Sequence, residues 1–338
     1  MSSVIVLGII GLPNAGKSTL FSMISGIDEG TSEHPFSTIR PRRSFIEIPD
    51  PLATKVAKQM QLQSVAPLGA EFVDVGGLVE GSSSGKGIGN QFLNVIRNAD
   101  ILVQVLNCYD PEAEVSPQRA VEIVDQELRD ADLAIIEKAL KDLDKRVEKH
   151  RDSVLALSNP MDEDLDSMLL LRPLLDGIRN TLKSGRNPYW EIIQSEVASA
   201  KLSEWHRLFK IVPQLLSIKH RYYVCNGDTD SDDIEVGSSA CSVITCFNLI
   251  EEERVPFLHA FFSRTNFQSM GLGRFFTIEG EQVQSWFFYQ GADVLEASGI
   301  IHPDIMKNFI KAEVYPWKAV ERHYKVSDGD ILRFVFSK

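Results

Sequence analysis

Residues 11–18 have the composition and spacing of a loop that binds phosphate. Their sequence follows the pattern G-x-x-x-x-G-K-S, and an apolar run at 4–10 precedes it. Glycines let the backbone approach a phosphate closely, and the following helix adds the positive end of its dipole. Lys17 can then reach the terminal phosphates, while the Ser18 hydroxyl can ligate Mg²⁺. The segment therefore predicts a nucleoside triphosphate site, whose phosphate side comprises Asn14, Ala15, Gly16, Lys17, Ser18 and Thr19.

Two further segments would complete a Mg²⁺ site. Asp74 ends an apolar run at 70–74 and opens the pattern Asp-x-x-Gly, in which the carboxylate holds Mg²⁺ and the Gly77 N–H meets the γ-phosphate. Thr38 ends a polar segment at 28–38, where a switch threonine closes over Mg²⁺ in phosphate-loop NTPases; the alternative is a loop threonine with a local hydrogen bond. We predict the catalytic residues to be Lys17, Thr38 and Gly77, and the Mg²⁺ ligands to be Ser18, Thr38 and Asp74.

Apolar runs around these residues predict the elements that position them. The runs alternate with helical patterns, which is typical of a mostly parallel sheet covered by helices. Residues 81–89 are rich in glycine and suit either a mobile second switch or a plain flexible loop. The predicted fold class is α/β, with strands at 4–10, 44–48, 70–74, 101–106, 222–226 and 242–246.

The remaining sequence predicts a helical insertion and a small α+β domain. At 113–205, apolar residues recur at helical spacing, which predicts an antiparallel helical hairpin broken at 158–160 and interrupted at Pro173. The basic stretch 141–151 suits a solvated face or an RNA contact. We therefore divide the chain into a split nucleotide-binding domain at 1–112 and 206–271, the insertion at 113–205 and a C-terminal domain at 272–338.

Composition excludes several classes of protein. The chain has 338 residues, 43% hydrophobic and 24% charged, as in globular proteins of two or three domains. A net charge of −12 argues against general binding of nucleic acid or membrane. The 4 cysteines lack zinc spacing, and no segment resembles a signal peptide or a membrane span. We expect a cytoplasmic protein with buried, reduced thiols.

Three segments together resemble the Obg-like ATPase (YchF) family of TRAFAC-class phosphate-loop NTPases. They are residues 11–21, the sequence His-Pro-Phe-Ser-Thr-Ile-Arg-Pro at 34–41, and the stretch 74–93. The resemblance implies that the insertion is a coiled-coil arm and that residues 272–338 form a TGS domain, shorter than the family pattern between positions 317 and 324. It also implies hydrolysis of ATP and association with the ribosome or a ribosomal subunit. We expect a monomer that does not contact membranes.

The resemblance also suggests how the site differs from other NTPases. Leu78 occupies the position of a catalytic glutamine in Ras-like proteins, so intrinsic hydrolysis should be slow. Asn14 matches an asparagine that ligates potassium in related NTPases, which suggests K⁺ as a second ion. Thr229 replaces the acidic residue that specifies guanine, so ATP should bind at least as well as GTP. Residues implied on the base side are Asn226, which would contact the adenine edge, Ser239 and Ala240.

Three functions remain open from the sequence. The leading one is a slow, Mg²⁺-dependent hydrolase of ATP, with GTP as a candidate second substrate, acting as a regulatory switch in translation or stress. A nucleotide-sensing scaffold with negligible turnover stays open because the catalytic glutamine is missing. A guanine-specific Obg-type GTPase is disfavoured by Thr229.

Overall fold

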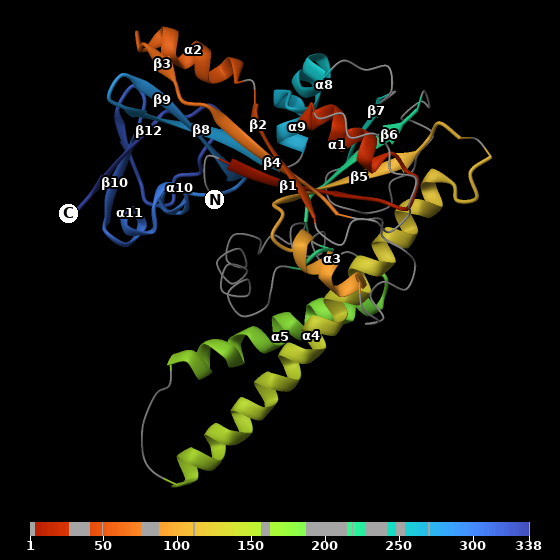
Figure 1. Ribbon diagram of the computed structural model, residues 1–338. Coiled ribbons are helices and arrows are strands. Elements are labelled where there is room, and N and C mark those ends of the chain that lie inside the picture. Colours follow the sequence, from red (N-terminus) through yellow and green to blue (C-terminus); the bar gives the residue numbers. More distant parts are fainter. Residues whose placement is uncertain are drawn as a thin grey trace.

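A six-stranded sheet forms the centre of the computed structural model, with strand order β2-β4-β1-β5-β6-β7 (Figure 1). The structure describes residues 4–26, 41–48, 50–75, 88–110, 112–156, 163–186, 215–217, 219–227, 242–247, 254–269 and 271–337. The strands are β1 (Val4–Ile10), β2 (Arg42–Ile48), β4 (Leu68–Asp74), β5 (Ile101–Asn107), β6 (Arg221–Asn226) and β7 (Ser242–Phe247). All pairs are parallel except β2 with β4. The predicted α/β class and the six predicted strands are confirmed.

Side chains of β1 contribute to two hydrophobic cores, one on each face of the sheet. Ile5, Leu7 and Ile9 face one core, shared with α1 (Lys17–Ser25) and α8 (Arg254–Phe261). Ile10 belongs to the opposite core, which includes side chains of α3 (Ile88–Ile96) and α4 (Pro117–Ala156). A strand that is apolar on both faces has to be covered on both. The phosphate-loop strand is therefore enclosed between two helical layers.

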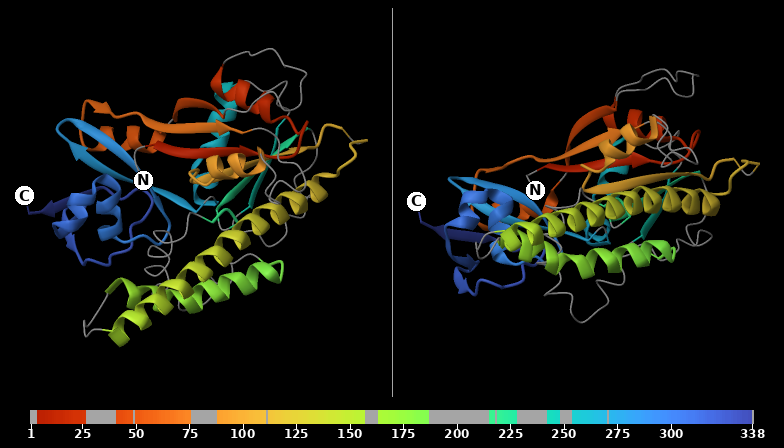
Figure 2. Two further views of the ribbon diagram at one scale, coloured as in Figure 1. Left: turned by 60° about the horizontal axis from the view of Figure 1, so that its bottom comes forward. Right: turned by 90° about the horizontal axis from the view of Figure 1, so that it is seen from below.

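Helices α4 and α5 (Glu163–Lys183) form the predicted arm (Figures 1 and 2). With 40 residues, α4 is about 60 Å long at 1.5 Å per residue. The two helices pack through an apolar cluster that contains Ile136, Leu140, Leu175, Ile178 and Leu182. The predicted interruption at Pro173 is wrong, because α5 continues through this residue. Within the described ranges, no helix combines the length and apolar character needed to cross a membrane.

Asp132 of α4 connects the arm to the end of α3 and to residues 216–217, which precede β6. Its carboxylate is fully buried and accepts hydrogen bonds from Arg97 Nη1 at 3.1 Å, just after α3, and from Leu216 N at 2.9 Å. The backbone N–H and the hydroxyl of Ser217 both donate to it at 2.7 Å. A buried carboxylate needs such partners to remain ionised. Asp132 thus links the arm to α3, the helix that follows the Asp-x-x-Gly segment.

The C-terminal part contains two three-stranded sheets, in the orders β3-β9-β8 and β11-β10-β12. Their strands are β3 (Ser64–Val65), β8 (Leu272–Glu279), β9 (Gln282–Tyr289), β10 (Phe309–Val314), β11 (Lys318–Val320) and β12 (Leu332–Phe336). The remaining helices of the described ranges are α2 (Pro51–Gln59), α9 (Arg264–Ser269), α10 (Val294–Ile301) and α11 (Pro303–Lys307). Because β3 pairs with β9, a segment before residue 272 joins the C-terminal sheet. The division into domains stays a prediction.

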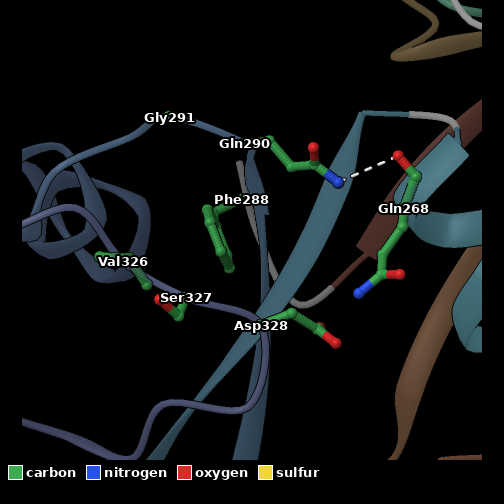
Figure 3. Close-up of a pocket in the computed structure, with 7 residues that line it drawn as sticks. All are labelled: Gln268, Phe288, Gln290, Gly291, Val326, Ser327 and Asp328. Carbon is green, nitrogen blue, oxygen red and sulfur yellow. Dashed lines mark hydrogen bonds between the residues drawn. The ribbon is translucent and has the colours of Figure 1, made fainter.

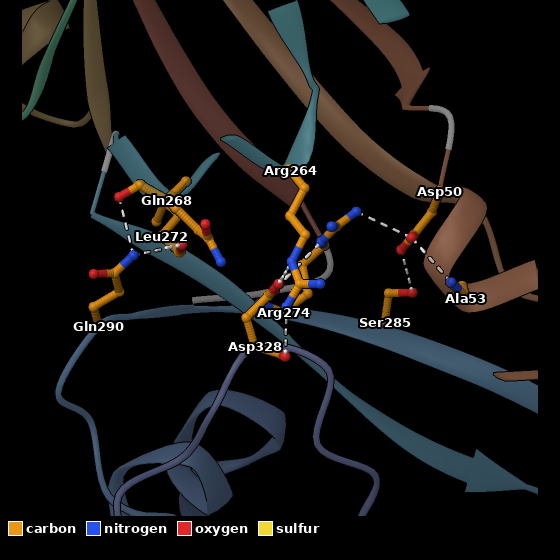
Figure 4. Close-up of polar contacts among 9 residues, drawn as sticks. All are labelled: Asp50, Ala53, Arg264, Gln268, Leu272, Arg274, Ser285, Gln290 and Asp328. Carbon is orange, nitrogen blue, oxygen red and sulfur yellow. Dashed lines mark hydrogen bonds and ion pairs between the residues drawn. The ribbon is translucent and has the colours of Figure 1, made fainter. Parts of the chain in front are cut away.

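Polar side chains fill the junction between the central sheet and β8 (Figure 4). Arg274 on β8 donates to Asp50 Oδ1 at 3.0 Å, and Ser285 Oγ donates to Asp50 Oδ2 at 2.9 Å. Asp50 also caps α2, accepting a hydrogen bond from Ala53 N at 3.0 Å. An N-cap carboxylate that also pairs with an arginine locks the end of β2 to the C-terminal part.

A cavity of about 530 Å³ lies beside this junction (Figure 3). Its wall includes Gln268 of α9, Phe288 of β9 and residues 326–328. Gln290 donates to the carbonyl of Gln268 at 2.9 Å across one side of it. The cavity is formed by the C-terminal part and α9, and the phosphate loop contributes nothing to its lining.

Candidate functional site

The phosphate loop connects β1 directly to α1, as its sequence predicts. Gly11 has φ +146° and Gly16 has φ +99°, values that favour glycine. A Cβ on Gly11 would lie 2.6 Å from the carbonyl oxygen of Val105, and one on Gly16 would lie 2.3 Å from Asn226 Nδ2. Both glycines are therefore required by close approach as well as by conformation. The loop leads at once into the first turn of α1, where Leu20 N donates to the Gly16 carbonyl at 2.9 Å.

Lys17 is the buried cation of the loop. Its side chain is 7% exposed, and Nζ donates to the Leu12 carbonyl at 2.6 Å. Burial lowers the pKa of Lys17 to about 8, while the nearby charge of Asp74 opposes this shift. A lysine held inside the loop by a backbone carbonyl can exchange that partner for a phosphate oxygen.

Asp74 lies at the carboxyl end of β4, beside the start of the phosphate loop. The parallel register pairs it with Ile9 of β1. Burial raises the pKa of the Asp74 carboxyl, and hydrogen bonding and charge from Arg42 act in the opposite direction, as does the charge of Lys17. The loop, the lysine and the acid thus meet at one edge of the sheet, as parallel strands require.

Arg42 joins this cluster, although the sequence analysis did not identify it. The antiparallel register of β2 and β4 places Arg42 directly opposite Asp74. Its guanidinium donates from Nε to Asp74 Oδ2 at 3.1 Å and from Nη2 to Ser18 Oγ at 2.9 Å, and Nη2 also forms an ion pair with Asp74 Oδ2. The guanidinium carbon lies 5.0 Å from the centre of the Phe21 ring. The basic run 40–43 after the first-switch segment was the available signal in the sequence.

Ser18 and Asp74 fit a Mg²⁺ ion. The hydroxyl of Ser18 and one carboxylate oxygen of Asp74 both contact the same nitrogen, Nη2 of Arg42. Two oxygen donors therefore converge on a single position that already holds a positive charge. Mg²⁺ prefers oxygen ligands and is held through one or two of them together with substrate phosphates. The donors and their placement match what this ion requires.

Asn226 reaches the phosphate loop from the end of β6. Its side chain is buried, and Nδ2 donates to the Ala15 carbonyl at 3.4 Å. Tyr109 supports the same loop from outside, because its hydroxyl donates to the Asn14 carbonyl at 3.0 Å. Asn14 itself has φ +61°, a conformation that asparagine tolerates better than most residues. Tyr109 carries no motif and was not predicted.

The structure brings together the predicted site residues that it describes. These are Asn14, Ala15, Gly16, Lys17, Ser18 and Thr19 of the loop and α1, Asp74 at the end of β4, and Asn226 at the end of β6. Four predicted residues lie outside the described residues: Thr38, Gly77, Ser239 and Ala240. The same holds for Leu78 and Thr229. Their roles remain predictions.

Two family models match parts of this chain. A family model described as a 50S ribosome-binding GTPase matches residues 6–156, and the YchF GTPase C-terminal model, described as a protein of unknown function, matches residues 272–323. The fold and site define a phosphate-loop NTPase with a GTPase-type nucleotide domain. The C-terminal match and the relatives described below make the chain similar to the YchF family. They do not identify the C-terminal part as a TGS domain.

Relatives match over almost the whole chain. Proteins named ribosome-binding ATPase YchF from Mycoplasma genitalium and Haemophilus ducreyi are 28% and 29% identical, with 98% of each chain covered. The structure of the Schizosaccharomyces pombe YchF GTPase superposes with a TM-score of 0.61 and 20% identity, covering 98% of this chain and 97% of that one. The arm and C-terminal part are therefore included in the likeness.

Proposed function

We propose that this protein is a Mg²⁺-dependent nucleoside triphosphatase that hydrolyses ATP slowly and acts as a nucleotide switch on the ribosome. The observation that carries the proposal is the convergence of Lys17, Ser18 and Asp74 at one end of the sheet, beside the glycines of the phosphate loop. Lys17 would contact the terminal phosphates, and Ser18 and Asp74 would hold Mg²⁺, which neutralises charge on the phosphates.

The residues of the proposed nucleotide site have distinct tasks, whether or not they belong to the described ranges. The backbone of residues 14–19 would enclose the phosphates, aided by the N-terminus of α1. Asn226 would hold the loop through Ala15 and lie close to the purine, supported by its buried position at the end of β6. Thr38 and Gly77 would complete the site when the γ-phosphate is present, while Ser239 and Ala240 would contact the base. Asn14 would ligate K⁺.

The ribosome enters the proposal through the relatives, which are named ribosome-binding ATPases. We propose that the protein works in the cytoplasm and as a monomer. We propose that the nucleotide domain spans 1–112 and 206–271, with the arm at 113–205 and a TGS-like domain at 272–338 as contact surfaces. The hydrogen-bonded carboxylate of Asp132, which ties the arm to the end of α3, supports a link between arm and nucleotide site.

Calorimetric titration with ATP and with GTP in Mg²⁺ buffer tests the proposal. We expect saturable binding of ATP at least as tight as that of GTP, and loss of both in Lys17→Ala. Single-turnover hydrolysis should be slow, should rise with ribosomes and should be faster in K⁺ than in Na⁺. Binding without turnover above the Lys17→Ala level would leave only the nucleotide-sensing scaffold. Much tighter binding of GTP would favour a guanine-specific enzyme.

A further inference from the structure

We propose that Arg42 is a built-in counter-ion of the cation site, which occupies the position of Mg²⁺ until nucleotide and metal arrive together. This inference rests on the proposed nucleotide site. It is carried by one juxtaposition: a single guanidinium nitrogen contacts both Ser18 Oγ and Asp74 Oδ2. These are the two side-chain oxygens of the described residues that the proposed metal would use.

The backbone places Arg42 there. Arg42 and Asp74 are partners in the antiparallel ladder between β2 and β4, so their side chains lie on the same face at the same height. Along β2 the buried side chains alternate, with Ile46 and Ile48 on the Arg42 face. A slip of one residue would expose that apolar face, so the register is strongly specified.

The guanidinium is held from several sides. Asp74 accepts contacts from two of its nitrogens, Nε and Nη2, and Ser18 accepts a hydrogen bond from Nη2. The centre of the Phe21 ring lies 5.0 Å from the guanidinium carbon. The Asp74 carboxylate is only 7% exposed, while the Arg42 side chain is 23% exposed. A buried carboxylate without a cation is costly, whereas an arginine near solvent can move without much loss of hydration. The aspartate thus keeps a cation in the resting site.

Two cations cannot share the same oxygens at bonding distance. Arg42 must release Ser18 and Asp74 before both can ligate a metal, and a bound polyphosphate supplies new acceptors for its freed guanidinium. Mg²⁺ should therefore add less to nucleotide affinity in the wild-type protein than in a variant without Arg42. Conversely, Arg42 should preserve nucleotide affinity when Mg²⁺ is removed, because it cancels the repulsion between Asp74 and the phosphates.

Neighbouring Arg43 offers a matched control. It lies on the opposite face of β2, is half exposed and pairs with Glu71 at 2.8 Å. Arg42→Met removes the charge and keeps a stem that can cover Phe21, whereas Arg43→Met removes a charge that does not face the site. Arg42→Lys keeps the positive charge but replaces the planar guanidinium and its several N–H donors with a single ammonium group.

The experiment measures the affinity of a fluorescent ATP analogue in excess Mg²⁺ and in EDTA, for wild type and the three variants. We expect the ratio of the affinity in Mg²⁺ to the affinity in EDTA to rise about tenfold in Arg42→Met. A factor of this size corresponds to the free energy of one charge-assisted hydrogen bond. The ratio should be unchanged in Arg43→Met and intermediate in Arg42→Lys. Urea unfolding checks that each variant is folded, and Arg42→Lys serves as the test if Arg42→Met is not.

The possible results separate the two proposals. An unchanged ratio in Arg42→Met would overturn the counter-ion role, and if affinity fell equally in Mg²⁺ and in EDTA, Arg42 would only support the fold. Nucleotide binding by the wild-type protein would still stand. Failure of the wild-type protein to bind the analogue in Mg²⁺, or binding that persists in Lys17→Ala, would instead overturn the proposed function.

Discussion

Asp50 and Arg274 form a buried ion pair at 3.0 Å, with exposed side-chain fractions of 4% and 3%. The pair joins the N-cap of α2 to β8, and so connects residues separated by 224 positions in the chain (Figure 4). Phe267 of α9 lies 4.9 Å from the guanidinium carbon, and Asp328 Oδ1 accepts the backbone N–H of Arg274 at 2.8 Å. Two acids and one aromatic ring thus surround a single buried arginine.

Arg274→Met should destabilise the protein by about 3–5 kcal/mol, because it leaves Asp50 buried without its cation. Urea unfolding measures the change. The control is Arg264→Met: Arg264 pairs with the same Asp328 at 2.8 Å but is 59% exposed, so its loss should cost less than about 1 kcal/mol. Equal effects of the two substitutions would contradict the importance of burial at this junction.

Gly16→Ala should abolish nucleotide binding, because a Cβ there would meet Asn226 Nδ2 at 2.3 Å in a backbone conformation that alanine avoids. Titration with ATP measures the loss. Gly185→Ala is a matched control, since Gly185 also has positive φ, at +75°, but its Cβ would meet nothing within 4 Å. That variant should lose about 1 kcal/mol of stability and retain nucleotide affinity. Normal binding in Gly16→Ala would show that the loop can rearrange.

Nucleotide binding should take up a proton above pH 8. The pKa of Lys17 is about 8 in the nucleotide-free protein because of burial, and phosphate charge next to the ammonium group should raise it. Affinity should therefore fall as the pH rises through and above 8, with a slope approaching one proton. Calorimetry in two buffers of different ionisation enthalpy measures the uptake, which should be absent at pH 6.5.

Lys219 provides the control for this measurement. Burial also lowers its pKa to about 8, but it contacts the carbonyl of Ala99 before β5, at the sheet edge opposite the phosphate loop. Lys219→Met should leave proton uptake on nucleotide binding unchanged. If this substitution removes the uptake, the assignment to Lys17 is incorrect.

Acid should weaken the fold through His220. Burial lowers the pKa of this histidine from 6.5 to about 4, and its ring stacks on Tyr289 at 6.2 Å. Between pH 6.5 and pH 4 the unfolded chain binds a proton that the folded protein excludes, so the free energy of unfolding should fall by about 1.4 kcal/mol per pH unit from this group. Urea unfolding at several pH values measures the slope, which should be one proton shallower in His220→Gln. An identical slope in that variant would contradict the prediction.

Much of the site was predictable because it depends on local sequence. The strand-loop-helix at 4–25 is specified by an apolar run, two glycines and a lysine, all within one short segment. Asp74 was identified by its place at the end of an apolar run before a glycine pair, and parallel strands bring such ends to one edge. The arm was predicted from helical spacing, although α5 tolerates Pro173 where the sequence suggested an interruption.

The sequence by itself thus determined the phosphate-loop conformation, the acid at the end of β4 and the six strands of the central sheet, because each follows from spacing within a few residues. Only the tertiary structure decided that β2 runs antiparallel to β4, which puts Arg42 on Asp74, and that β3 pairs with β9. It also brought Asn226 to Ala15, 211 positions away in the chain. Pairings of this kind depend on which surfaces pack together, and no local pattern records them.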